Sequence, residues 1–220
     1  MNPLYEQVRP TTLDAVVGQS KAIARLRLVE RNGGFGGHAF FISGKSGTGK
    51  TTLAEIICQS IAEPDFITSV HGRDCTIDFW RYWFDTVRFS GGWLGQVKRG
   101  RALMVEEAHG IRKDSFDYAL PLIEKKLPKH AVITFTTLQE RKDDGLFALD
   151  CDESAFMSRL VEIELTNQGV NGPYAELAMQ IAQAHGLDGK PLAAYKRLLN
   201  ECGQNLRMAL SRIEAGEMLA

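Results

Sequence analysis

Apolar residues recur along the first three quarters of the chain with two alternating periods. Short, mostly apolar runs are typical of strands buried on both faces of a sheet, and they cover residues 39–42, 66–70, 102–105 and 131–135. Amphipathic helical spacing fills the intervals, at residues 20–32, 50–62, 76–89 and 114–126. We expect the first helix to be capped by Ser20 and the last to end before Pro128. Residues 160–165 alternate apolar and acidic residues, as an edge strand does.

The order of these segments predicts an α/β fold. Strands that alternate with helices form a parallel sheet whose two faces are covered. After Thr166, the Gly- and Asn-rich residues 167–173 indicate a linker. Only helical spacing follows, at residues 173–185, 191–201 and 204–218. We therefore predict a five-stranded α/β domain at residues 1–166 and a small three-helix domain at residues 167–220.

Composition and charge indicate a globular protein. The 220 residues are 44% apolar and 24% charged, with a net charge of −1. The chain has no apolar run of membrane-spanning length and no signal-peptide pattern at its start. Its four cysteines show neither metal-ligand nor redox spacing. We expect a cytoplasmic protein that does not associate with membranes.

The clearest chemical motif is a glycine-rich loop between the first predicted strand and the next helix. Its sequence fits G-x-x-x-x-G-K-[ST], the Walker A pattern: Gly44, Lys45, Ser46, Gly47, Thr48, Gly49, Lys50 and Thr51. Glycines let backbone N–H groups converge on an anion, and the helix N-terminus adds partial positive charge. We predict that these residues and Thr52 hold the phosphates of ATP. Lys50 would reach the terminal phosphates, and the Thr51 hydroxyl would bind Mg²⁺.

Two adjacent carboxylates end the third predicted strand, in the layout of a Walker B motif. Glu106 is predicted to contact the Mg²⁺ shell and Glu107 to orient or activate the attacking water. Aspartate is usual at the first position, and the extra methylene of Glu106 re-aims its carboxylate. Hydrolysis is therefore expected to be slow or conditional.

Beyond these motifs, nearly the whole chain resembles AAA+ ATPases of the clamp-loader branch, such as bacterial gamma subunits and the small subunits of replication factor C. The segment from Tyr5 to Gln19 is similar to that family's KYRP-x-x-L-x-x-V-V-G-Q opening. Met157 to Leu160 resembles its SRC motif, and Gly203 to Leu210 resembles the sensor 2 motif of its lid helix. The resemblance implies a P-loop AAA+ module in which the three-helix domain is the lid.

The same resemblance assigns roles to individual residues. It implies an adenine pocket lined by Arg9, Pro10, Val16 and Val17. It also implies a sensor 1 residue at Thr136 or Thr137, an arginine finger at Arg159 that reaches a neighbouring subunit's ATP, and a sensor 2 arginine at Arg207. The residues leave other interpretations open. Arg159 is also placed to be a solvated cap on the sheet, and Arg207 to form an ion pair with Glu201. The two threonines are also ordinary strand formers.

Three departures from the family pattern change the expected assembly. Only Cys58 and Cys75 lie between the two Walker motifs, too few for a four-cysteine site, so we expect no zinc module there. Leu160 replaces the cysteine of the SRC motif, and Ala220 ends the chain directly after the predicted lid. We therefore expect no collar domain, and an assembly that differs from the clamp-loader pentamer.

Nucleic-acid contacts are predicted less specifically. Residues 71–142 carry a modest excess of basic side chains, including Lys98, Arg99, Arg101, Arg112, Lys113, Lys125 and Lys126. Arg81 and Arg88 share one helical face. These basic side chains either contact DNA without sequence preference or are simply solvated.

Two further groups also have two interpretations. Trp80, Trp83 and Phe84 belong either to a core or interface or to a base-stacking surface. His109 is either part of the loop after the acids or a link from the nucleotide to the next helix.

Two functions follow from these motifs. The first is an ATPase that forms a homo-oligomeric ring or spiral, binds Mg·ATP between subunits and loads or remodels a protein assembly, such as a clamp, on DNA. The alternative is an ATP-gated DNA-binding switch or targeting factor that recruits a partner enzyme with little turnover.

Overall fold

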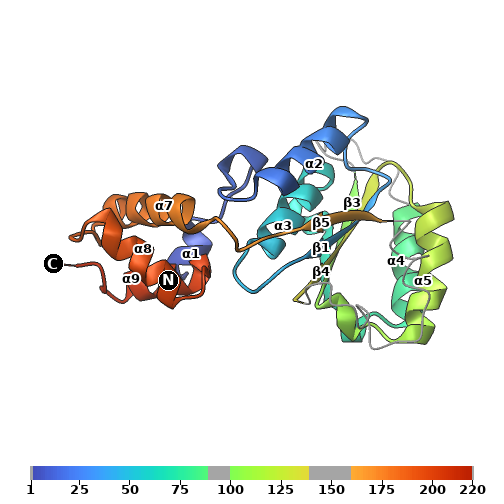
Figure 1. Ribbon diagram of the computed structural model, residues 1–220. Coiled ribbons are helices and arrows are strands. Elements are labelled where there is room, and N and C mark those ends of the chain that lie inside the picture. The colour runs from blue at the N-terminus through green and yellow to red at the C-terminus, as the bar shows by residue number, and fades with distance from the viewer. Residues whose placement is uncertain (1, 89–99, 139–159, 220) are drawn as a thin grey trace.

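A five-stranded parallel sheet forms the centre of the larger domain (Figure 1). The structure, a computed structural model, describes residues 2–88, 100–138 and 160–219. The strand order is β2-β3-β4-β1-β5, and every paired neighbour is parallel. The strands are β1 (Ala39–Ser43), β2 (Ile67–His71), β3 (Arg101–Glu106), β4 (Ala131–Thr137) and β5 (Val161–Glu164). The predicted sheet and the edge position of β5 are confirmed.

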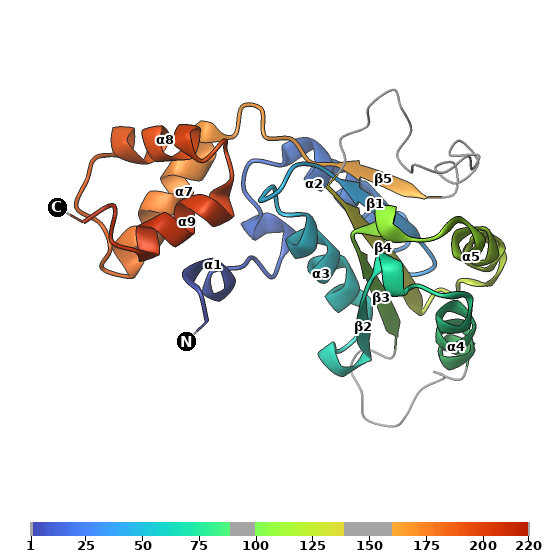
Figure 2. The same ribbon diagram turned by 90° about the horizontal axis from the view of Figure 1, so that it is seen from below.

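Alternate residues of the central strands enter two separate cores, because successive side chains of a strand point to opposite faces. Phe40 and Ile42 of β1 pack in the core beneath α2 (Ser20–Arg31) and α3 (Lys50–Ile61). Phe41, between them, packs on the other face beneath α4 (Ile77–Arg88) and α5 (Lys113–Lys126). Figures 1 and 2 show these two helical layers on either side of the sheet. Burial on both faces explains the nearly continuous apolar runs of these strands.

The lid consists of α7 (Asn171–Ala184), α8 (Leu192–Glu201) and α9 (Leu206–Glu214). The short N-terminal helix α1 (Leu4–Gln7) lies beside α9 rather than beside the sheet (Figure 1). Leu4 is buried in the lid core, and its backbone N–H donates to Glu214 at 3.1 Å. The first residues of the chain therefore pack against its last helix.

Two expectations about helix starts are wrong. Ser20 does not cap α2: Gln19 is the residue before the first turn, and Ser20 is the first helical residue. The predicted linker is also shorter than expected, because α7 begins at Asn171, within it. α5 ends at Lys126, before Pro128 as predicted.

Short 3-10 helices connect several elements: η1 (Leu13–Ala15), η2 (Pro64–Phe66), η3 (Gly72–Asp74) and η4 (Ala108–Gly110). In the part of the chain that the structure describes, no helix combines the length and apolar character needed to cross a membrane.

Candidate nucleotide-binding site

The predicted site residues meet at the carboxyl edge of the sheet, where the lid approaches it. Since all five strands are parallel, the segments that follow β1, β3 and β4 emerge at one edge, which is where ligands bind in open α/β sheets. The phosphate loop follows β1, the two acids lie at the end of β3 and just after it, and the threonine pair ends β4. α1 and α9 cover the site from the lid side (Figure 2).

The phosphate loop has the backbone conformation that its glycines allow. Gly44, Gly47 and Gly49 all have positive φ, and Gly49 directly precedes α3. A Cβ on Gly44 would lie 2.7 Å from the Leu165 carbonyl oxygen, so the segment after β5 also requires glycine there. The Thr48 hydroxyl donates to the Lys45 carbonyl at 2.8 Å and closes the loop.

Lys50 is held by the loop itself. Its Nζ donates to the carbonyl oxygens of Gly44 and Lys45, each at 2.8 Å, and only 9% of the residue is exposed. The pKa of Lys50 is lowered to about 8, chiefly by burial; Glu107 opposes the change and Arg207 adds to it. An ammonium group with so little solvation favours the arrival of an anion.

Glu106 and Glu107 occupy different environments although they are adjacent. Glu106 ends β3, and its Oε1 accepts a hydrogen bond from the Ser69 hydroxyl of β2 at 2.9 Å. Glu107 follows in the left-handed conformation, with φ 51° and ψ 53°. A non-glycine residue in this region is strained by about 1–3 kcal/mol, and such residues cluster at functional sites. Both acids line one polar cavity with Lys50 and Thr51.

The threonines at the end of β4 face opposite sides of the sheet. Thr136 lines the polar cavity, on the same strand face as Thr134, which contacts Cys58 of α3. Thr137 is 1% exposed, and its hydroxyl lies 3.3 Å from His109 Nδ1. The geometry therefore favours Thr136 as the residue that meets a bound nucleotide.

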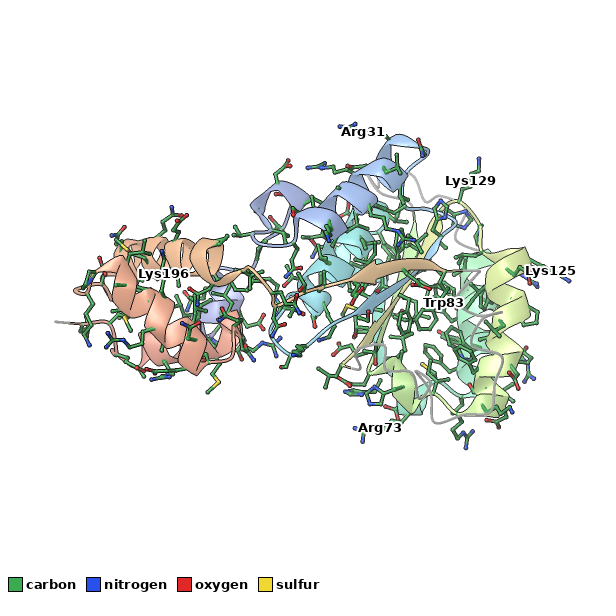
Figure 3. All side chains as sticks on the ribbon, viewed as in Figure 1. Arg31, Arg73, Trp83, Lys125, Lys129 and Lys196 are labelled. Atoms are coloured by element: carbon green, nitrogen blue, oxygen red, sulfur yellow. The ribbon has the colours of Figure 1, made fainter. Side chains whose placement is uncertain are left out.

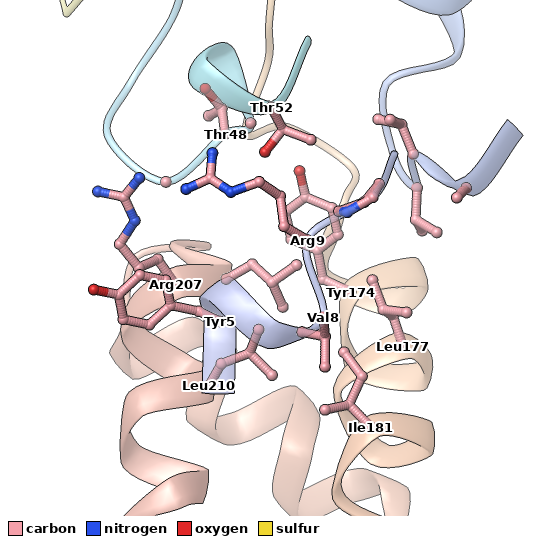
Figure 4. A pocket seen from close by; sticks show the side chains of 17 residues that line it. Tyr5, Val8, Arg9, Thr48, Thr52, Tyr174, Leu177, Ile181, Arg207 and Leu210 are labelled. Atoms are coloured by element: carbon pink, nitrogen blue, oxygen red, sulfur yellow. The ribbon is translucent and has the colours of Figure 1, made fainter. Parts of the chain in front are cut away.

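An apolar cavity of about 280 Å³ adjoins the polar one (Figure 4). It lies between the opening segment, the phosphate loop and the lid. Its walls include the four residues predicted for the adenine pocket, Arg9, Pro10, Val16 and Val17, and also Tyr5, Val8, Tyr174, Leu177, Ile181 and Leu210. The two cavities share Tyr5, Arg9, Gly47, Gly49, Thr52 and Arg207.

Two arginines stand where the cavities join, and in Figure 4 both guanidinium groups point toward the phosphate loop. Arg9 pairs with Glu6 and, at 3.2 Å, with Glu55 of α3, so it ties the opening segment to the helix after the loop. Arg207 lies over the ring of Tyr5, with Cζ 5.5 Å from the ring centroid. Glu201, the alternative ion-pair partner predicted for Arg207, pairs with Arg212 instead, at 3.0 Å.

Several residues of this site were not predicted. Tyr5 and Asn205 lie inside the two segments that resemble family motifs, so those motifs held the signal that could have found them. Glu55 and Tyr174 carry no local signal, since each is one polar residue on an amphipathic helix. Arg159 and the Ser158 before it lie outside the described residues, as do Lys98 and Arg99.

The aromatic cluster is core. Trp80, Trp83 and Phe84 are at most 4% exposed and pack in the core between α4, α5 and the sheet. Figure 3 shows Trp83 in this layer. The base-stacking alternative is therefore wrong for these three residues.

The two arginines of α4 pair with acids one turn earlier, Arg81 with Asp78 at 2.8 Å and Arg88 with Asp85 at 3.7 Å. Lys125 and Arg73 project from the outer surface in Figure 3.

Comparison with known proteins supports this assignment of the fold and the family resemblance. The chain is 34% identical over 128 residues to replication-associated recombination protein A of Coxiella burnetii, a match that covers 56% of the chain. It is 36% identical over 125 residues to the protein of that name from Haemophilus influenzae, again over 56% of the chain. DNA polymerase III subunit gamma/tau of Mycobacterium tuberculosis is 27% identical over 162 residues, or 63% of the chain. No family model matches.

Solved structures agree on the architecture. RuvB of Thermotoga maritima, a Holliday junction branch migration motor, superposes over 94% of this chain and 64% of its own, with a TM-score of 0.68 at 21% identity. A single-residue variant of the same protein gives a TM-score of 0.71 at 20% identity. The chain has the AAA+ fold. The predicted resemblance to clamp-loader AAA+ proteins is confirmed, and its homologues are DNA replication and recombination proteins. The matches span about a quarter of the length of these curated relatives.

Proposed function

We propose that this chain is an ATPase module that binds Mg·ATP between its α/β domain and its lid. The observation that carries the proposal is the continuity of the two cavities. An apolar cavity suits an adenine ring, and it opens through Arg9 and Arg207 into a polar cavity that holds Lys50, Thr51, Glu106 and Glu107. A nucleoside triphosphate has the same order of groups.

The residues present fit a magnesium ion. The Thr51 hydroxyl and the Glu106 carboxylate are oxygen donors, which Mg²⁺ prefers, and Lys50 stands beside them as the cation that a polyphosphate needs. When bound, the ion supplies charge neutralisation between the phosphates. Lys50 would exchange its two loop carbonyls for phosphate oxygens, Glu107 would orient the attacking water, and Thr136 would lie near the terminal phosphate. Arg207 would bring the lid onto the nucleotide.

The setting of the activity is inferred from the relatives. Because they are replication and recombination proteins, we infer that the module works in a homo-oligomeric ring or spiral on DNA, with sequence-independent contacts and a protein partner. Arg159 would act on the nucleotide of the neighbouring subunit. Loading or remodelling a protein assembly on DNA is the task we propose.

One observation favours the alternative of a slow nucleotide-gated switch. The Ser69 hydroxyl holds the Glu106 carboxylate toward β2. A carboxylate held in this way contributes less to the metal shell, so hydrolysis would be slow. ATP binding would still order the lid and recruit a partner enzyme.

The test measures nucleotide binding and phosphate release separately, with and without primed DNA. We expect fluorescent ATP to bind in the presence of Mg²⁺, Lys50→Ala to lose binding, and Glu107→Gln to bind but release no phosphate. Lys21→Ala, an exposed lysine on α2, is the matched control and should behave as wild type. Absence of adenine-nucleotide binding by the wild-type chain would refute the proposal. Binding without phosphate release would select the switch. Particle size with a non-hydrolysable ATP analogue tests the oligomer.

A further inference from the structure

A histidine ring connects the predicted water-activating acid with the end of a neighbouring strand. His109 lies in η4, two residues after Glu107, and its Nδ1 is 3.4 Å from Glu107 Oε2. The same nitrogen is 3.3 Å from Thr137 Oγ1 of β4. One ring atom therefore faces a group from each of the two strand ends that border the polar cavity.

Glu107 is held on its backbone side as well. A Cβ on Gly72 of η3 would lie 2.4 Å from the Glu107 carbonyl oxygen, and that oxygen accepts from Gly110 N at 2.8 Å. The left-handed backbone of Glu107 is thus enclosed, and its carboxylate is the part with freedom to turn. Thr137 is buried and points away from the cavity that Thr136 lines.

The chemistry of the three groups makes the contact a shared one. An ionised carboxylate only accepts hydrogen bonds, so the nitrogen that faces Glu107 must carry a proton. Thr137 Oγ1 has lone pairs within reach of the same N–H. At 3.4 Å and 3.3 Å both contacts are longer than the usual N–H···O hydrogen bond of about 2.7–3.2 Å, so neither acceptor binds the N–H tightly. If the Glu107 carboxylate turns away, the N–H keeps Thr137 as a partner and is not left unsatisfied, which lowers the cost of the movement.

We propose that His109 is a positioning residue that sets the direction of the Glu107 carboxylate and releases it toward the attacking water while retaining Thr137. The contact makes the aim of Glu107 depend on the end of β4, where the adjacent Thr136 meets the terminal phosphate. This inference rests on the proposed ATPase function, since it assigns a supporting residue to the same site.

The first test separates positioning from binding. We expect His109→Leu to lower kcat about tenfold with the Kd for ATP changed less than twofold. His109→Asn, which places an N–H near the position of Nδ1, should restore most of the loss. Thr137→Val should lower kcat in the wild-type background and have little further effect in His109→Leu. His185→Leu, an exposed histidine after α7, is the control. Unchanged kcat in His109→Leu, or equal losses in kcat and affinity, would overturn the proposal.

The second test does not depend on turnover. Nitrogen NMR of the histidine rings in the nucleotide-free protein reports the Nδ1 environment, and the His109 signal is assigned by its loss in His109→Asn. Glu107→Gln and Thr137→Val should each shift that signal, and the His185 signal should stay in place. If neither variant moves the His109 signal, the contact is refuted. If the signal moves but wild-type protein neither binds nor hydrolyses ATP, the proposed function fails and the shared contact stands.

Discussion

The carboxamide of Asn205 in the lid lies directly on Gly47 of the phosphate loop. A Cβ built on Gly47 would lie 1.9 Å from Asn205 Oδ1 and 2.3 Å from its Cγ. The same Oδ1 caps α9 by accepting from Met208 N at 3.1 Å. The first turn of α9, which carries Arg207, is therefore seated on the loop that would hold the phosphates.

This contact predicts a specific rescue. Gly47→Ala should weaken ATP binding at least tenfold, because φ is +75° at this position and the new methyl group meets Asn205. Asn205→Ala should recover part of that loss in the double variant. Gly49→Ala is the matched control, since its φ is +99° but a Cβ there has no neighbour within 4 Å. Fluorescence titration with ATP measures the Kd of each variant. If Asn205→Ala restored the ATP affinity of Gly49→Ala as much as that of Gly47→Ala, the steric explanation would be contradicted.

The lowered pKa of Lys50 predicts a pH-dependent affinity. With a pKa of about 8, the side chain is charged at pH 7 and mostly neutral at pH 9. A bound polyphosphate raises this pKa, so binding takes up a proton above pH 8, and ATP affinity should fall about tenfold between pH 7 and pH 9. Lys50→Arg, which stays charged, should bind with little pH dependence over this range. A wild-type affinity that is flat from pH 7 to 9 would show that Lys50 is not the phosphate ligand.

The lowered pKa of Lys50 also predicts how the stability of the nucleotide-free protein depends on pH. The stability should rise with pH, whereas the ATP affinity should fall. Its folded pKa of about 8 lies below the ordinary value of 10.5, so the unfolded chain binds more protons between these two values. The free energy of unfolding should therefore gain a favourable contribution as the pH rises from 8 toward 10.5, while below pH 8 the buried ammonium is unfavourable. Urea denaturation of wild type and Lys50→Met at pH 7.5 and 9.5 measures this contribution, which Lys50→Met should lack. An equal pH response in the two proteins would contradict it.

Gln19 forms three hydrogen bonds where the α/β domain meets the lid, two with the backbone of Thr166 and one with Tyr174 of α7. Its Nε2 donates to the Thr166 carbonyl at 2.8 Å and the Tyr174 hydroxyl at 3.0 Å, and its Oε1 accepts from Thr166 N at 3.1 Å. Gln19 is 3% exposed, so Gln19→Ala should lower the free energy of unfolding by about 2–3 kcal/mol by leaving buried groups unsatisfied. Tyr174→Phe, which removes one bond, should cost about 1 kcal/mol. Urea denaturation measures both, and equal effects of the two variants would show that the backbone of Thr166 gains nothing from Gln19.

The position of the α4 aromatic residues predicts a strong contrast on one helix. Trp80 is fully buried, so Trp80→Ala should destabilise the protein by about 3–5 kcal/mol. Tyr82, two residues later and 72% exposed, should change stability by less than about 0.5 kcal/mol when replaced by Ala. Thermal or urea unfolding decides the comparison. A Trp80→Ala variant of wild-type stability would place the ring outside the core.

The local patterns of the sequence were sufficient to determine the sheet, its flanking helices and the phosphate loop. Strand and helix periods are properties of neighbouring residues, and the glycine conformations at Gly44, Gly47 and Gly49 follow from the backbone that an anion nest requires. The acids after β3 were also predictable, because the end of a parallel strand gives its last polar residues one location, the carboxyl edge of the sheet.

Tertiary structure alone decided how distant segments complete the site. Gln19 and Tyr174 are 155 residues apart, and Leu4 reaches Glu214 across 210 residues. The choice of Thr136 over Thr137 depended on which sheet face carries α3, and the choice of Glu201 for Arg212 depended on how α8 and α9 pack. No periodic pattern encodes such pairs, because the two residues are far apart in the sequence and meet only through the packing of their elements.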